Sequence, residues 1–159
     1  VLSKNAKMYR SGQGVYRSSY KNAMRLARTE INRSYRLADY ERRKSLSFVV
    51  GIEVRRSNHD YGCPVCESLK GRYPKDFIFT GWHPHCRCHT VSILSTEAEF
   101  IEQQKAILEG REGEVKSRNT VDSVPTNFTN WLQENRERIE NAKAKPLWMR
   151  ENRKFIKKG

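Results

Sequence analysis

The grouping of the cysteines constrains this chain more than any other feature of its sequence. All four lie in one short stretch, at Cys63, Cys66, Cys86 and Cys88. Disulfide frameworks usually spread their cysteines along a chain, whereas metal sites gather them in pairs. The pattern therefore predicts a metal-binding module in a protein from a reducing compartment. Four thiols without a metal are the alternative.

Zinc is the ion that these residues favour, because it binds sulfur and imidazole ligands in a tetrahedron. The two-residue spacer of Cys63-Pro-Val-Cys66 lets both sulfurs turn toward one ion. In Cys86-Arg-Cys88, the alternate spacing places both side chains on one face of an extended segment. His83 lies three residues before Cys86, so five donors compete for four places. We expect Cys63, Cys66 and Cys88 to bind first, Cys86 next, and His83 as the leading substitute.

The predicted role of the Zn2+ ion is structural. A catalytic zinc keeps an open position and needs a base nearby. Here the donors saturate the ion, and the spacing of Glu67, Asp60 and Asp76 nominates none of them as a base. A loop-rich segment with little apolar content needs a cross-link to stay folded, and a metal supplies one. We therefore predict that the chain is not an enzyme.

Residues 18–45 are predicted to form a long basic amphipathic helix. Apolar side chains recur there every three or four residues and form one stripe, which comprises Tyr20, Met24, Ala27, Ile31, Tyr35 and Ala38. We expect this stripe to face the core, which would leave Arg36, Arg42 and Arg43 at the surface. The chain carries a net charge of +13. Such an excess favours a polyanionic partner, so we predict weak, sequence-indifferent binding of double-stranded DNA by these arginines.

The remaining patterns predict an α+β fold, with the long helix packed on a small two-stranded, zinc-stapled, loop-rich module. Alternating apolar residues indicate a strand at 48–56, and β-branched residues indicate a second strand at 90–94. Thr96 and Glu99 form a capping-box pattern at the start of another helix. Along the chain we expect a connector (1–17), the helix and module (18–94) with a zinc knuckle at 57–90, a helix (95–109), a mobile linker (110–124) and a helical C-terminal segment (125–159).

Several short motifs of this chain together resemble the phage Mu F-like head morphogenesis family of minor head proteins. They are Arg28-Thr29-Glu30, Cys63-Pro-Val-Cys66, Leu69-Lys70-Gly71 and His83-Pro84-His85-Cys86-Arg87-Cys88. The last motif is the most specific, because it stands in register with an upstream cysteine pair. Gly81-Trp82 and Tyr73-Pro-Lys-Asp-Phe77 are similar to a Bacteroidetes-type variant of the family. The resemblance covers residues 18–94, which would then be a Mu F-like domain.

This resemblance implies a minor head protein of a tailed bacteriophage or prophage. Such a protein associates with portal and capsid proteins, lies close to DNA, and is found in the virion and in the cytoplasm of the bacterial host. The shared motif gives Arg28 and Glu30 a possible structural role against the zinc module. The alternative is that Glu30 pairs with Arg33 or Ser34 on the helix surface.

Two other classes of function remain open on the sequence. One is a zinc-stabilised DNA-binding module or metal nuclease outside a virion, in which His83, His85 and His89 would serve the metal chemistry. The other is a protein-binding adaptor whose basic helix docks on an acidic surface. A membrane partner is not expected, because the longest apolar run, Phe48-Val49-Val50, is far too short to cross a bilayer.

Overall fold

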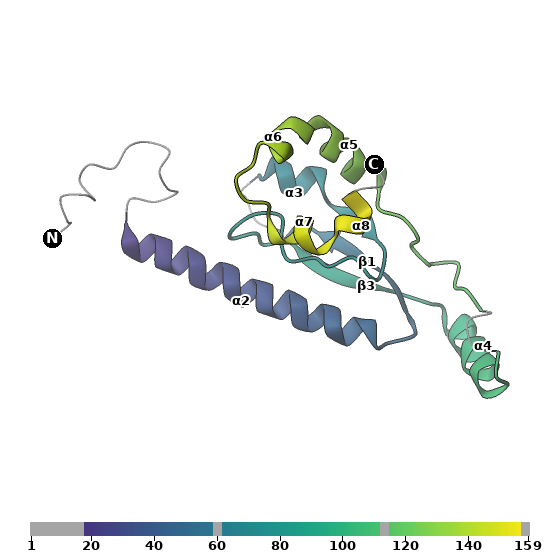
Figure 1. Ribbon diagram of the computed structural model, residues 1–159. Coiled ribbons are helices and arrows are strands. Elements are labelled where there is room, and N and C mark those ends of the chain that lie inside the picture. The colour runs from purple at the N-terminus through teal and green to yellow at the C-terminus, as the bar shows by residue number, and fades with distance from the viewer. Residues whose placement is uncertain (1–17, 59–61, 112–114, 157–159) are drawn as a thin grey trace.

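The computed structural model describes residues 18–58, 62–111 and 115–156, and its architecture confirms the α+β class (Figure 1). The predicted connector, 1–17, lies outside the described residues. Helix α4 stands apart from the other helices at one end of the molecule (Figure 1). The elements follow in the order α2 (Ser19–Lys44), β1 (Val49–Arg55), α3 (Pro64–Ser68), β2 (Gly71–Tyr73), β3 (His89–Leu94), α4 (Glu97–Leu108), α5 (Thr126–Glu134), α6 (Arg136–Glu140), α7 (Leu147–Glu151) and α8 (Arg153–Ile156).

The long helix begins and ends where its local signals predict. Ser18 is the N-cap, and its hydroxyl accepts a hydrogen bond from the backbone N–H of Lys21 at 3.4 Å. Arg42, Arg43 and Lys44 fill the last turn, where positive charge is favourable beside the unpaired carbonyl groups. The helix has 26 residues, so it extends over about 39 Å.

The sheet has one more strand than predicted. Among the described residues, the strand order is β2-β1-β3, and both pairings are antiparallel. The pairing of β1 with β3 confirms the two expected strands. The third strand, β2, comprises only Gly71–Tyr73, which is too short for an alternating pattern to reveal. It places Tyr73 opposite Ile52 on the central strand.

An aromatic core joins the sheet to the C-terminal helices. Trp82 is only 3% exposed, and its ring lies 5.0 Å from that of Phe79 and 5.2 Å from that of Trp148, between centroids. The indole N–H of Trp148 donates to the carbonyl of Trp82 at 3.1 Å. Phe128 of α5 is fully buried in the same cluster. The C-terminal helices therefore complete the core of the module instead of standing apart from it.

A buried asparagine fixes the last helices on the loop after β2. Asn152 is fully buried; its amide oxygen accepts from the backbone N–H of Ile78 at 2.9 Å, and its amide nitrogen donates to the Ile78 carbonyl at 2.8 Å. Paired in this way, a buried amide avoids the cost of an unsatisfied polar group. This contact fixes the C-terminal segment at one place on the loop.

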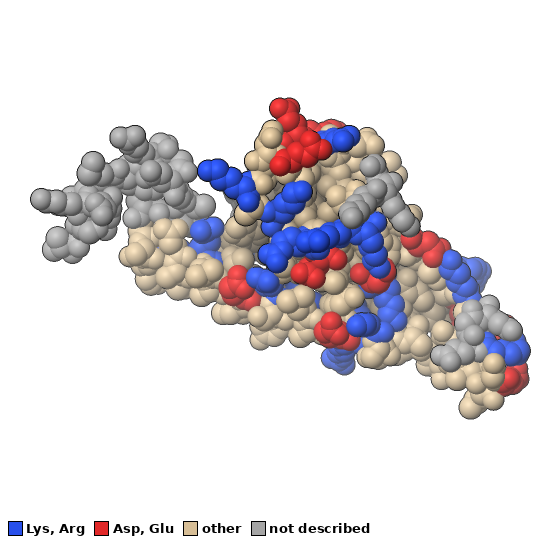
Figure 2. Space-filling view, in the orientation of Figure 1, with Lys and Arg blue, Asp and Glu red and all other residues tan. Residues whose placement is uncertain are grey.

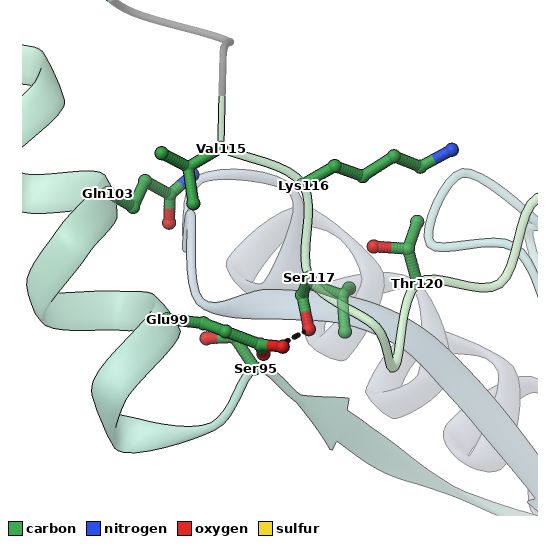
Figure 3. A pocket seen from close by; sticks show the side chains of 8 residues that line it. Ser95, Glu99, Gln103, Val115, Lys116, Ser117 and Thr120 are labelled. Carbon is green, nitrogen blue, oxygen red and sulfur yellow. Dashed lines mark hydrogen bonds between the residues drawn. The ribbon is translucent and has the colours of Figure 1, made fainter.

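The segment predicted as a mobile linker, 110–124, is held to the fold over residues 115–124. Thr96 and Glu99 form the predicted capping box, and Glu99 also accepts a hydrogen bond of 2.7 Å from Ser117 (Figure 3). Further on, the backbone N–H of Val121 donates to the carbonyl of Val50 at 3.2 Å. Gly51 permits this approach, because a Cβ atom there would lie 2.7 Å from Val121 Cγ2.

The apolar stripe of α2 faces away from the module, which corrects the expectation that it is buried. Tyr20, Ile31 and Tyr35 are all exposed. The opposite face of the helix contacts the module, through Thr29, Arg36 and other polar side chains. The periodicity therefore predicted the helix correctly and the buried face wrongly.

Candidate metal centre

The cysteines and His83 come together where the loop around Cys86 meets helix α2. They form two overlapping groups of possible metal ligands. One group comprises Cys63, Cys66 and His83, and the other comprises Cys66, Cys86 and Cys88. Within each group the donor atoms lie within 4.8 Å of one another. All five predicted donors are therefore placed together, and Cys66 is common to both groups.

The spacing of the donors fits a tetrahedral ion with sulfur and nitrogen ligands. The sulfurs of Cys66 and Cys86 are 3.8 Å apart, and the edge of a tetrahedron with zinc–sulfur bonds of about 2.3 Å is about 3.8 Å. His83 Nε2 lies 3.2 Å from the Cys63 sulfur and 3.1 Å from the Cys66 sulfur. These distances are a few tenths of an ångström shorter than the edge of about 3.5 Å expected between sulfur and nitrogen ligands of zinc.

A short helix positions the first cysteine pair. Cys63 is the N-cap of α3 and Pro64 occupies the first helical turn, where its fixed φ angle suits the helix. The backbone N–H of Glu67 donates to the Cys63 carbonyl at 3.0 Å. Cys66 follows one turn later and is buried. The two sulfurs therefore lie on the same side of this turn.

A tight turn positions His83 and Cys86. The backbone N–H of Cys86 donates to the carbonyl of His83 at 3.1 Å, and His85 has a φ of 60°. Proline followed by a residue with positive φ is typical of a type II turn. This conformation is unfavourable for a residue other than glycine. A hydrogen bond of 3.0 Å from the His85 N–H to the Thr29 hydroxyl of α2 helps to stabilise it.

The hydrogen bond made by the second ring nitrogen of His83 leaves Nε2 free to bind a metal. His83 Nδ1 lies 2.8 Å from the carbonyl of Pro84. A carbonyl oxygen can only accept a hydrogen bond, so Nδ1 carries the proton and Nε2 keeps its lone pair. Metal-binding histidines commonly use a backbone carbonyl in this way.

Arg36 attaches α2 to the backbone of the metal-binding loop, which corrects its predicted place in a DNA-binding surface. Its guanidinium donates to the carbonyls of Thr80 at 3.1 Å, Cys86 at 2.6 Å and Cys88 at 2.8 Å. Burial lowers the pKa of this guanidinium, and the neighbouring sulfur of Cys86 opposes the change. A Cβ atom at Gly81, which has a φ of 101°, would lie 2.5 Å from Arg36 Nη1. The glycine therefore provides the space that the arginine occupies.

The structure also corrects the predicted place of Arg43. This side chain is buried, and its guanidinium donates to the hydroxyl of Thr90 on β3 at 2.9 Å. Only Arg42, of the three arginines expected at the surface, is exposed. The expectation failed because the apolar stripe of α2 faces solvent, and Arg36 and Arg43 lie on the opposite face, which contacts the module.

The middle residue of the Arg28-Thr29-Glu30 motif forms a hydrogen bond with the module. Arg28 is exposed, and the carboxylate of Glu30 pairs with Arg33 at 3.2 Å on the helix surface. Thr29 accepts the hydrogen bond from His85 N–H and donates one of 2.6 Å to the Arg25 carbonyl. In this motif Thr29 therefore supplies a hydrogen bond between the helix and the turn at 83–86.

Hydrogen bonds among the buried thiols move the pKa values of Cys66 and Cys86 in opposite directions. The hydrogen bonds that Cys86 shares with Cys66 and Cys88 lower the pKa of Cys86, and the bond between Cys66 and Cys86 raises the pKa of Cys66. One thiolate is thus stabilised at the expense of its neighbours. A divalent cation would favour the loss of the remaining protons, because its ligands bind as thiolates.

Two of the three carboxylates considered as possible bases form ion pairs elsewhere. Glu67 forms ion pairs with Lys70 and Arg56, and Asp76 forms one with Lys154. Asp60 lies outside the described residues. In the described part of the chain, these carboxylates thus give the metal centre no free general base.

Comparison of the chain with protein-family models, curated proteins and solved structures finds no match. The chemistry of the centre therefore rests on its own residues. In the described ranges, none of the helices combines the length and apolar character needed to cross a membrane.

Proposed function

We propose that the centre binds one structural Zn2+ ion, which ties α3, the turn at 83–86 and the start of β3 into one unit. The observation that carries this proposal is the convergence of five sulfur and imidazole donors around Cys66. Zinc with three thiolates and one neutral histidine has a net charge of −1, and zinc with four thiolates has −2. The positive charge of Arg36, bound to the carbonyls of Cys86 and Cys88, would offset part of either.

We further propose that the chain acts as a minor head protein of a tailed bacteriophage or prophage, in contact with portal and capsid proteins. The sequence resemblance supports this proposal. Three of its motifs are distant in sequence but lie together at the candidate centre, through Thr29, the Cys63–Cys66 pair and the turn at 83–86. Residues that contact one another in this way are expected to be conserved together in a family, so their proximity supports the resemblance.

Particle composition tests the phage proposal. Phage particles would be purified from a lysed culture of the bacterium that carries this gene, and their proteins quantified by mass spectrometry. We expect peptides of this chain at a copy number close to that of the portal protein and far below that of the major capsid protein. Particles that contain the portal protein but none of this chain would contradict the proposal.

We expect no hydrolysis of DNA, peptide or ester substrates by the purified protein. Five donors are available for the four places of a tetrahedral ion, and Glu67 and Asp76 are held in ion pairs. We therefore expect neither an open metal position for water nor a base beside it. Plasmid nicking in the presence of Mg2+ or Zn2+ is the most sensitive assay. Metal-dependent nicking that disappears in a His83→Ala variant would favour the metal nuclease alternative instead.

We expect weak, non-specific binding of double-stranded DNA, at exposed cations other than Arg36 and Arg43. Lys and Arg residues form a band across the face of the molecule shown in Figure 2. Lys145, Arg150 and Arg153 on the C-terminal segment are exposed, and none forms an ion pair with a described residue. Binding through phosphates should have a dissociation constant in the micromolar range or weaker and fall steeply as salt rises from about 50 to 200 mM.

Fluorescence anisotropy with a labelled duplex measures this binding. Replacing Lys145, Arg150 and Arg153 together with Gln should reduce the affinity and leave the melting temperature unchanged. If no binding is detected at low salt, the exposed cations do not serve to bind DNA, and a protein partner becomes the candidate.

A further inference from the structure

Helix α2 carries an apolar seam that faces solvent. Its positions follow alternating steps of four and three residues, as in the heptad pattern of coiled coils. Five of them are apolar (Tyr20, Met24, Ala27, Ile31 and Ala38), and one is the polar Ser34. Tyr20 is 71% exposed and Ile31 is 55% exposed, and Tyr35 beside the seam is 72% exposed. In Figure 2 much of the surface over α2 is free of charged residues. Contiguous exposed apolar surface of this kind is typical of a docking site.

The helix cannot turn to bury this seam against its own module. At about 100° per residue, Ala27 and Arg36 lie about 180° apart around the helix. Arg36 is fixed by three carbonyl groups, and Thr29 and Arg43 hold the same inner face. The seam therefore remains available to another helix as long as the module is folded.

One flank of the seam is positively charged. Lys21, Arg28 and Arg42 occupy equivalent heptad positions beside it and are exposed. None of the three forms an ion pair within the described ranges. A partner helix would therefore meet three cations along one side of its contact.

A second copy of the chain does not supply the complementary charge. In a parallel pair of α2 helices, Arg28 and Arg42 of one copy would face Ala23 and Leu37 of the other. In an antiparallel pair Lys21 of one copy would face Arg42 of the other, and like charges at these positions are unfavourable. Acidic side chains in a different helix would pair with all three.

We propose that the outer face of α2 docks an amphipathic helix from another protein, with acidic residues beside its apolar seam. The apolar contact would supply most of the binding, and the acidic flank would select the orientation and the partner. The inference goes beyond the proposed function, because it depends neither on the identity of the metal nor on a role in a phage head.

A pair of synthetic helices tests the proposal against the full chain. Both peptides carry Leu and Ile along a four-heptad seam; one has Glu at the flanking positions and the other has Lys. We expect the Glu peptide to bind about tenfold more tightly than the Lys peptide at low salt. Equal binding of the two peptides, or binding of neither, would overturn the proposal.

Two variants separate the seam from the rest of the helix. Ile31→Glu should abolish binding of the Glu peptide. Leu26→Glu should leave binding largely intact, because Leu26 is similarly exposed, at 61%, but lies about 140° away from Ile31 around the helix. Both variants should retain the melting temperature of the parent chain. Equal loss in the two variants, or a parent chain that sediments as a dimer and becomes monomeric only with Ile31→Glu, would contradict the proposal.

Discussion

A Cys66→Ala variant is expected to lose the metal and to unfold the segment 57–90. Cys66 belongs to both groups of possible ligands, so its removal leaves neither group intact. Structural zinc contributes on the order of 10 kcal/mol to the folding of small modules, which exceeds the total stability of many domains. Circular dichroism would show loss of strand and helix signal, and hydrogen exchange would show loss of protection across the segment.

Controls for this prediction come from the same region. Ser68→Ala changes an exposed side chain on the same short helix and should leave metal content and melting temperature unchanged. His83→Ala and Cys86→Ser distinguish the fourth ligand, because only the residue that binds the ion should release it on substitution. A Cys66→Ala variant with the melting temperature of the parent chain would contradict a structural role for the metal.

Replacing Arg36 with Ala is expected to destabilise the protein by about 3 kcal/mol. The change leaves the carbonyls of Thr80, Cys86 and Cys88 without their donor, and one hydrogen bond to a charged group contributes roughly 1.5–3 kcal/mol. The three bonds share one guanidinium, so their contributions do not add in full. Arg36→Lys should recover only part of the loss, because an ammonium group cannot reproduce the planar fork of the guanidinium.

Denaturant unfolding at a fixed zinc concentration measures this effect. Arg42→Ala is the matched control, since Arg42 lies on the same helix but is exposed, and its substitution should change the free energy of unfolding by less than about 0.5 kcal/mol. If Arg36→Ala and Arg42→Ala unfold at the same denaturant concentration, Arg36 does not hold the helix on the module.

Features encoded by neighbouring residues were predictable from the sequence. The ends of α2 follow from Ser18 and the serine after its last turn, and the start of α4 follows from the capping box of Thr96 and Glu99. The paired spacing of the cysteines predicted which side chains gather, because a two-residue spacer limits where both sulfurs can point. These signals act within a few residues and need no knowledge of the tertiary structure.

Features that depend on contacts between distant segments were not predictable in this way. The Arg36 side chain bonds carbonyls more than forty positions further along the chain, and no local pattern distinguishes it from an exposed arginine. Periodicity gave the apolar stripe of α2 but not the face that meets the module. Strand β2 is too short to show alternation, and Asn152 is buried only because the backbone of Ile78 satisfies its amide.

The metal content of the purified chain tests the central claim most directly. Elemental analysis combined with thiol titration of the folded protein should find close to one zinc per chain. The four cysteines should be protected from the thiol reagent until a chelator removes the ion, and the protein should then unfold. A folded, metal-free protein in which all four thiols react freely would contradict the metal-stapled module.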